Sequence, residues 1–584
     1  MSERSTNPEV WKQWLRELSE DETGDTAIES DPDDPEVDHV NKSDDDTDSE
    51  FDGDECNSEN EDVLSHIGRD GTTKWRNTPV LSSHSRTRRE NIIIHLPGTK
   101  GHARNALTPL ESLKCILDDK MLSMITNYTN LYIEKIKGQY TRERDAQETN
   151  ELEIWALIGL LFLAGVKKSG RQSVRDLWDR SGTGIEIFYM TMSYNRFFFL
   201  MRCLRFDDHR DRLQRSEIDK LAPIREIFEI FIQNSQNSFT PSEFLTVDEQ
   251  LVAFRGRCSF RQFIPSKPAK YGIKIFLLVD TKNMYTINAE VYVGLQRDGP
   301  YKQRNTPDEV VKRLVNPVSG TNRNITFDNW FSSLQLAIDL QKYFKLTCIG
   351  TLRKNKREVP ASFVNVKGRE VSSSIFGYLK NGRCTLVSYI PKKGRIVLAL
   401  STMHFDNAIV TQPKPKPQII IDYNSSKFGV DIVDKMCSGY NVGRNNRRWP
   451  LTVFFNILNL AGINSQVIYN ANKPLGGSNE SRASFLQSLA LELIKPQLKK
   501  RLFTKAVPRS IKTKIKIFLG TQEEIPSEKD AAGSSGRCHI CRRTRDRKSR
   551  FVCAKCRNYV CRDHYKVVCE DCMEYECYSE SEEN

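Results

Sequence analysis

The spacing of apolar residues changes along this chain, and the change separates a helical region from a sheet region. Between Leu107 and Pro241 apolar residues recur at i, i+3 and i+4, the pattern of amphipathic helices. The longest apolar run there, Ile154 to Val166, is 13 residues long, which is too short to span a membrane. We therefore expect a buried core helix at this run and no membrane association.

After residue 242 the runs become rich in β-branched and aromatic residues, which predicts strands. Glu243–Phe254, Lys270–Asp280 and Thr286–Gly294 each suit a strand, and the second is apolar enough to be buried on both faces. Arg323–Ser333 predicts a short strand before a helix, and Lys345–Arg357 a strand that ends in a basic loop. Strands that first pair antiparallel and then form a β-α-β passage predict a mixed α/β sheet.

The later regions differ in composition. Short β-like pieces among many Lys, Gly and Pro residues before residue 416 indicate an insertion rather than a continuation of the sheet, and a helical pattern returns at Leu451. The predicted organisation begins with a disordered N-terminal region (residues 1–95). A helical domain follows in two parts (96–242 and 441–520), and between them lies a sheet domain in two parts (243–353 and 417–440) with an insertion (354–416). A linker (521–536) and a cysteine-rich domain (537–577) end the prediction.

The charge is distributed unevenly over the 584 residues. The net charge is +11, but residues 17–62 hold 22 Asp and Glu against one lysine, so the remaining chain carries +32. A body this basic attracts polyanions, of which nucleic acid is the commonest, although an inert basic surface is the alternative. The acidic region lacks the apolar residues needed to fold. We expect it to compete with nucleic acid, to recruit a nuclear protein partner, or only to keep the protein soluble.

Four aspartates are candidates for metal binding. Asp431 and Asp434 are three residues apart, which places both on one face of a helix, although helix capping is the commoner use of such residues. Asp248 lies in a predicted strand among apolar neighbours, and Asp328 ends another strand. If the sheet brings these carboxylates together beside the helix, they suit one or two Mg²⁺ (or Mn²⁺) ions, which would serve in-line phosphoryl transfer.

Two basic groups accompany these carboxylates in the sequence. We expect both to contact nucleic-acid phosphates, with a solvated surface as the alternative for the loop. The first group follows the aspartate pair and consists of Arg444, Arg447, Arg448 and Trp449. The second group is the loop after a predicted core strand and consists of Arg353, Lys354, Lys356 and Arg357.

Eight of the fifteen cysteines crowd between Cys538 and Cys577. The spacing C-x2-C-x11-C-x2-C-x4-C-x2-H-x4-C-x2-C gives four close ligand pairs, and alternate pairs suit two tetrahedral Zn²⁺ ions in cross-brace order. The two predicted sets are Cys538, Cys541, Cys561 and His564, and Cys553, Cys556, Cys569 and Cys572. Cys577 is left as a free thiol. RING and PHD modules share this ligand pattern, so a chromatin or ubiquitin adaptor is an alternative function.

Several longer motifs occur in a fixed order and carry a family resemblance. They are TVDEQLVAFRGRC, KYGIKIFLLVD, RNITFDNWFSS, GTLRKNKREVP, GVDIVDKMCSGYN, RRWP and INSQVIY. This set resembles the piggyBac family of DNA transposases from about Leu107 to the C-terminal tail. The resemblance implies a ribonuclease H-like catalytic core with an insertion, a split all-α dimerisation and DNA-binding domain, and a small zinc domain that binds transposon ends.

The resemblance also assigns roles. Asp248, Asp328 and Asp431 match the catalytic aspartate triad, Asp434 matches a fourth acidic residue, and Trp449 matches an aromatic near the active site. Trp449 would stack on an unpaired base or serve as a buried anchor. The implied activity is metal-dependent excision through hairpin intermediates and integration at TTAA sites, by a nuclear homodimer. A domesticated transposase that binds DNA without catalysis is the closest alternative.

Overall fold

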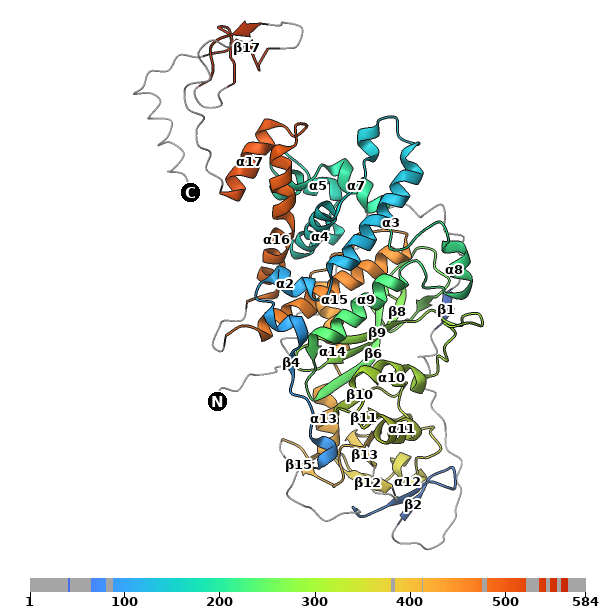
Figure 1. Ribbon diagram of the computed structural model, residues 1–584. Helices are drawn as coiled ribbons and strands as arrows, with labels where there is room; N and C mark the ends of the chain where they lie inside the picture. The colour runs from blue at the N-terminus through green and yellow to red at the C-terminus, as the bar shows by residue number, and fades with distance from the viewer. Residues whose placement is uncertain are drawn as a thin grey trace. The chain divides into compact units, whose positions relative to one another are not determined.

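The β-rich runs after residue 242 form strands of one mixed sheet of twelve strands (Figure 1). In sheet order the strands are β1 (Val40–Lys42), β7 (Arg261–Phe263), β8 (Tyr271–Asp280), β6 (Phe244–Ala253), β10 (Asn324–Phe327), β11 (Thr347–Thr351), β14 (Arg395–Ser401), β13 (Thr385–Lys392), β12 (Ser374–Leu379), β3 (Lys74–Arg76) and β2 (Ser65–Ile67), with β9 (Thr286–Val291) paired to β8. Short pairs form elsewhere: β4 (Gly98–Thr99) with β5 (Phe239–Thr240), and β15 (Ile409–Val410) with β16 (Lys416–Pro417).

The computed structural model describes most of the chain in two compact units, Met1–Pro508 and Arg509–Asn584. The described residues are 40–42, 65–79, 88–379, 384–411, 413–474, 480–520, 535–541, 547–553 and 558–565. The predicted linker at 521–536 therefore lies almost entirely outside the described residues.

Five strands form the centre of the sheet. β8 is antiparallel to both β6 and β9, whereas β10 is parallel to both β6 and β11. All residues of β8 after the first are buried, as expected for a strand covered on both faces. This order of antiparallel and parallel strands fits a ribonuclease H-like core, and it confirms the predicted mixed α/β sheet.

The region predicted as an insertion extends this sheet instead of interrupting it. β14 pairs antiparallel with β11, and β13 and β12 follow it. Tyr389 and Ala399 of this region share a buried cluster with Ile349 of β11 and with Ile419. The prediction that residues 354–416 do not continue the sheet is therefore wrong. If the sheet ended at β11, the outer backbone N–H and C=O groups of β11 would be unpaired. β14 pairs with these groups and so continues the sheet.

Residues 65–79 and 88–95 also differ from the prediction, because they are ordered. β2 and β3 form a hairpin that pairs with β12. Trp75 of β3 is 0% exposed, and its indole donates to the Glu358 carbonyl over 2.9 Å. Arg69 donates to the carbonyls of Lys356 (2.9 Å) and Val359 (3.1 Å). Trp75, one buried aromatic side chain, thus anchors part of an N-terminal region whose overall composition is polar.

Helices surround the sheet. Those before it are α2 (Pro109–Lys114), α3 (Asp119–Lys137), α4 (Glu151–Val166), α5 (Val174–Leu177), α6 (Glu186–Thr191), α7 (Tyr194–Cys203), α8 (Arg212–Ile218) and α9 (Arg225–Ser238). Those between and after its strands are α10 (Pro307–Val315), α11 (Leu334–Phe344), α12 (Ala361–Val364), α13 (Gln418–Ser426), α14 (Gly429–Gly439), α15 (Trp449–Ala471) and α16 (Arg482–Phe503).

The helical regions before and after the sheet pack together, as the split prediction requires. α4 packs along α16, and α15 packs against α2 and α9 (Figure 1). Nearly every residue of α4 is buried, which confirms the predicted core helix. Among the described helices, α15 alone has the length and composition to cross a membrane, but 89% of its most apolar window is buried inside the protein.

Candidate active site and metal centres

Asp248 and Asp328 lie at the same level on neighbouring parallel strands. Val247 of β6 is the register partner of Phe327 of β10, and each aspartate is the next residue. The Asp248 carboxylate accepts from the Glu249 N–H over 2.8 Å, and the Asp328 carboxylate accepts from the Trp330 N–H over 2.9 Å. The parallel pairing therefore places the two aspartates side by side, Asp248 within β6 and Asp328 directly after β10, as the predicted metal site requires.

Helix α14 carries the other two aspartates and packs against β6 and β8. A Cβ atom at Gly429, the first residue of α14, would lie 2.7 Å from the Thr246 hydroxyl, so only glycine allows this close approach. Phe428 is the N-cap residue, so neither aspartate occupies the capping position. Asp431 is exposed in the first turn, and Asp434 is half-buried one turn later.

The carboxylates influence one another electrostatically. Desolvation raises the pKa of the Asp248 carboxyl well above its ordinary value, and the nearby carboxylates of Glu249 and Asp328 raise it further. Burial raises the pKa of Tyr423 to about 12, with contributions from Asp328, Asp248 and Asp431. One tyrosine on α13 is thus close enough for all three carboxylates of the predicted triad to influence it electrostatically.

Lys267 is a cation beside the same carboxylates. Desolvation by itself would lower the pKa of its amine, but Glu249, Asp248, Asp431 and Asp434 raise the pKa overall. The amine also donates to the Glu249 carbonyl over 3.1 Å. Lys267 was not predicted from the sequence, although its motif, IPSKPAKYG, leads directly into the buried strand β8.

Asp434 is held by a chain of amides. The Gln250 side chain donates to the Asp434 carboxylate over 3.0 Å, and Asn456 of α15 donates to Gln250 over 2.9 Å. Desolvation raises the pKa of Asp434 above its ordinary value, although the Gln250 hydrogen bond opposes this shift. These contacts give Asp434 a supporting position between β6 and α15.

The donor chemistry of this site fits a hard divalent cation. Neighbouring carboxylates in a partly desolvated site repel one another, and a divalent cation would remove that repulsion while taking oxygen ligands. Among the residues that the structure describes, the aspartates do not form a group with ligand atoms all within 4.8 Å. Direct binding by all three would therefore require the carboxylates to move closer together.

Three of the four residues predicted to contact DNA behind the aspartates are buried, which corrects that prediction. Arg444 is 7% exposed and donates to the Ser169 hydroxyl over 2.7 Å, and Arg448 is 4% exposed and donates to the Leu204 carbonyl over 2.6 Å. Trp449 is 0% exposed and packs edge-on against Phe260. These side chains join the start of α15 to the helical region, so the buried-anchor alternative holds for Trp449.

Replacing Trp449 by alanine is therefore expected to destabilise the fold. Loss of a fully buried indole lowers the free energy of unfolding by about 3–5 kcal/mol. Denaturant unfolding checks this, and Trp449→Phe should lose less because it keeps a ring against Phe260. A stable Trp449→Ala variant with weakened DNA binding would instead support the stacking role.

A cavity of about 1040 Å³ opens beside Asp434. Its lining includes Gln250, Lys267, Arg255 and Arg447, and both arginines are exposed. A Cβ atom at Gly256 would lie 2.6 Å from the Arg447 carbonyl oxygen, so the loop after β6 touches the start of α15 through its backbone. Arg447 thus remains a candidate for phosphate contact. Arg255, in the motif AFRGRC, is a further candidate that was not predicted from the sequence.

The predicted basic loop lies close to Asp328. The Arg353 guanidinium donates to the Asn329 amide oxygen over 3.3 Å, and Lys354 and Arg357 are exposed. Arg69 of the N-terminal hairpin donates to the Lys356 carbonyl and so fixes the loop backbone. Phosphate contact by Arg353, Lys354, Lys356 and Arg357 stays a prediction.

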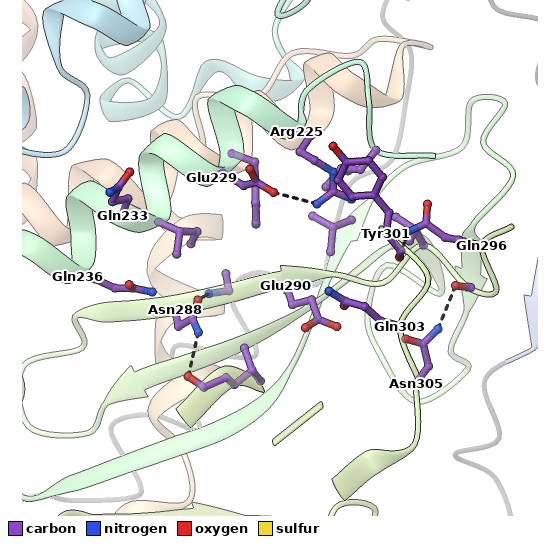
Figure 2. Close-up of a pocket in the computed structure, with 18 residues that line it drawn as sticks. Arg225, Glu229, Gln233, Gln236, Asn288, Glu290, Gln296, Tyr301, Gln303 and Asn305 are labelled. Atoms are coloured by element: carbon purple, nitrogen blue, oxygen red, sulfur yellow. Dashed lines mark hydrogen bonds and ion pairs between the residues drawn. The ribbon is translucent and has the colours of Figure 1, made fainter. Parts of the chain in front are cut away.

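A second cavity, of about 320 Å³, lies between α9, β9 and the segment that follows β9 (Figure 2). Its charged groups are paired: Arg225 with Asp219 (2.6 Å) and Glu229 (3.1 Å), and Glu290 with Arg313 (2.7 Å). Amide side chains line much of the remaining wall. The cavity therefore offers no excess of positive charge for a phosphate group.

Three thiols and one imidazole of the second unit form a close group. The ligand atoms of Cys538, Cys541, Cys561 and His564 lie within 4.8 Å of one another. The Cys541 and Cys561 sulfurs are 3.7 Å apart, and the His564 Nδ1 atom lies 3.3–3.6 Å from the three sulfurs. Ligands at ordinary zinc distances in a tetrahedron are about 3.5–3.8 Å apart, so this group fits Zn²⁺.

The Cys538 thiol is suited to ionisation. Although desolvation opposes it, hydrogen bonds from the backbone N–H groups of Cys561, Ile540 and Cys541 lower the pKa of Cys538 to about 5. Of the second predicted set, Cys553 is described, whereas Cys556, Cys569 and Cys572 lie outside the described residues, as does Cys577. The second zinc ion therefore stays a prediction.

The unit that holds this group also contains a basic helix. α17 (Arg509–Leu519) buries Ile511 and Ile515, and β17 (Gly536–Arg537) pairs with β18 (Lys548–Ser549). Arg509 donates to the Asn558 amide oxygen over 2.7 Å, which links α17 to the cysteine-rich part.

Comparison with known proteins identifies the family. The family model described as Transposase IS4 matches residues 108–466. The human piggyBac transposable element-derived protein 3 is 23% identical over 369 residues, which are 60% of this chain and 60% of that protein. The human chimeric ERCC6-PGBD3 protein is also 23% identical over 369 residues, but this chain spans only 33% of its length.

A solved structure supports the same conclusion. The piggyBac transposase in a synaptic complex with hairpin DNA is 36% identical, with a TM-score of 0.72, and the match covers 82% of this chain and 100% of that chain. The family model alone covers more than half of the sequence. The chain therefore belongs to the piggyBac family of transposases.

Proposed function

We propose that this protein is a cut-and-paste DNA transposase that cleaves and joins DNA by metal-dependent phosphoryl transfer. The observation that carries the proposal is that Asp248 and Asp328 lie side by side in the register of two parallel strands, with Asp431 on the helix that packs against β6. We infer excision through hairpin intermediates and integration at TTAA sites from the family and from the hairpin DNA of the solved relative. A homodimer is the expected active form, because that relative forms a synaptic complex.

The side chains around the site have separate tasks in this proposal. Asp248, Asp328 and Asp431 would hold one or two Mg²⁺ or Mn²⁺ ions, which when bound activate a water or a 3′-hydroxyl and stabilise the leaving oxygen. Asp434 fixes α14 to β6 through Gln250. Lys267 offsets part of the negative charge beside the carboxylates. Arg255 and Arg447 would bind the phosphates of a DNA strand in the cavity beside Asp434.

Replacing Arg255 or Arg447 by alanine is expected to weaken DNA binding without unfolding the protein. Each exposed arginine that contacts a phosphate contributes to the salt dependence, so the slope of log K against log salt should fall by about one per variant. Fluorescence anisotropy at several salt concentrations checks this. Arg297→Ala removes an exposed arginine after β9 that pairs with Glu217 at 3.9 Å, and should leave the slope unchanged. An equal loss there would contradict a local phosphate contact.

A cleavage assay tests the function itself. Purified protein should nick and excise DNA that carries the element's own ends and flanks when Mg²⁺ is added, and should yield hairpin-ended products. Binding of this DNA without cleavage would favour a domesticated DNA-binding factor, which the human relative makes a relevant alternative. If the protein neither binds nor cleaves this DNA, the result would favour a RING- or PHD-like adaptor.

The remaining regions have proposed roles that follow from this activity. The cysteine-rich unit would bind transposon ends through its basic residues, and the all-α region would mediate dimerisation and DNA binding. A transposase acts on chromosomes, so we expect a nuclear location. The acidic N-terminal region would recruit a nuclear protein or compete with DNA for the basic surface.

A further inference from the structure

Two buried threonines bond to one buried serine where β6, β10 and α13 meet. Thr246 and Thr326 are register partners on adjacent parallel strands, and both are buried. The Thr246 hydroxyl donates to the Ser426 carbonyl over 2.6 Å, and the Thr326 and Ser426 hydroxyls lie 2.7 Å apart. Ser426 donates its own hydrogen to the Asp422 carbonyl over 2.7 Å, so Thr326 is the donor to Ser426. We call Thr246, Thr326 and Ser426 the hydroxyl clamp.

Each member of the clamp precedes one aspartate of the site. The two threonines stand two residues before Asp248 and Asp328, and Ser426 stands five residues before Asp431. Because side chains two apart on a strand share a face, Thr246 lies on the face of Asp248. The clamp is therefore a buried layer behind the carboxylates.

The clamp ties the turn between two helices to the sheet. α13 ends at Ser426 and α14 begins at Gly429, so only Lys427 and Phe428 connect the two helices. Thr246 contacts this turn twice, through its bond to Ser426 and through the close approach of Gly429. The first turn of α14, which holds Asp431, thus receives its position from the two strands that hold the other aspartates.

We propose that the hydroxyl clamp sets the position of Asp431 relative to Asp248 and Asp328, and thereby the affinity of the site for a divalent cation. This inference rests on the proposed function, and it assigns positioning rather than catalytic roles to Thr246, Thr326 and Ser426. Residues that orient metal ligands from behind change metal affinity or activity by about 10–100-fold when they are replaced.

The test removes one hydroxyl at constant shape. In Thr246→Val and Thr326→Val the Mg²⁺ concentration for half-maximal cleavage should rise by about tenfold. At saturating Mg²⁺ the cleavage rate of both variants should return close to that of the wild type. Mn²⁺ binding, measured by electron paramagnetic resonance without DNA, should weaken by a similar factor. Thr246→Ser keeps the hydroxyl and should restore both values.

A matched control comes from the same sheet. Thr286 of β9 is 0% exposed, and among the described residues its hydroxyl has no hydrogen-bond partner. Thr286→Val therefore removes a buried hydroxyl that bonds nothing, and should change neither Mn²⁺ binding nor cleavage. Thermal unfolding of all variants separates loss of folding from loss of metal affinity.

Each result decides between the possibilities. Unchanged Mn²⁺ affinity and Mg²⁺ requirement in both valine variants would overturn the clamp. So would a Thr246→Ser variant as impaired as Thr246→Val. If the wild type binds Mn²⁺ but cleaves no DNA, the proposed function fails, while the Mn²⁺ affinities of the variants still test the clamp.

Discussion

Asp248→Asn is expected to lose DNA strand cleavage by about 10³-fold or more, which corresponds to about 4 kcal/mol of transition-state stabilisation. The amide has the shape of the carboxylate but removes a negative charge and an anionic metal ligand from the site. DNA binding should persist, because the exposed Arg255 and Arg447 and the cysteine-rich unit are unaltered. Gel analysis of cleavage products and anisotropy measurements of binding check the two halves of the prediction.

The same variant should be at least as stable as the wild type. Desolvation and the neighbouring carboxylates raise the pKa of Asp248, so its ionised form costs folding free energy at neutral pH. A neutral asparagine removes that cost, and the melting temperature should stay equal or rise. A loss of cleavage with a large fall in melting temperature would indicate unfolding rather than loss of a ligand.

Asp328→Asn and Asp431→Asn should show similar defects, and double variants should add little, because metal ligands act as a unit. Asp308→Asn is the matched control, since Asp308 lies in the first turn of α10 and pairs with Lys312 at 3.6 Å. Cleavage by Asp248→Asn at the wild-type rate would remove the triad assignment.

Loss of zinc is expected to abolish the fold of the cysteine-rich part and to weaken binding to transposon ends by more than tenfold. Structural zinc sites supply about 10–16 kcal/mol of binding free energy, which is folding free energy in so small a module. Cys538→Ser should therefore lose at least one zinc ion per chain, and elemental analysis of the purified protein measures it. The wild type should hold two ions, and Cys556→Ser should also lose at least one.

Two controls make the zinc prediction specific. Cys577→Ser changes the predicted free thiol and should keep both the zinc content and the end binding. Chelation of the wild type should reproduce the binding defect of Cys538→Ser, and added zinc should reverse it. End binding that survives complete chelation would contradict a DNA-binding role for this unit, and a wild type with one ion would contradict the second ligand set.

The sequence predicted the sheet and the close cysteine group because both depend on local spacing. The runs of β-branched and apolar residues around Asp248 and Lys274 favour strands regardless of their partners, and the pairs C-x2-C and C-x2-H place ligands within one short segment. The four residues predicted for the first zinc site are the four that the structure brings together.

The failed predictions concern properties that depend on distant partners. Nothing in the letters RRWP indicates that Arg448 points at the carbonyl of Leu204, 244 residues earlier, rather than at solvent. Trp75 likewise finds its partner at Glu358, so the N-terminal region could not be predicted to end in an ordered hairpin. The pairing of β14 with β11 depends on an open sheet edge, which a single segment does not reveal.

The packing of α4 against α16 has a consequence for how the chain is made. More than 300 residues separate the two helices, so a ribosome synthesises the whole sheet region before α16 emerges. Until then α4, which is apolar on every side, lacks its partner and exposes surface that favours aggregation. We expect the nascent chain to need chaperone protection over this interval, and folding of the helical region to be slow, because its contacts are so distant in sequence.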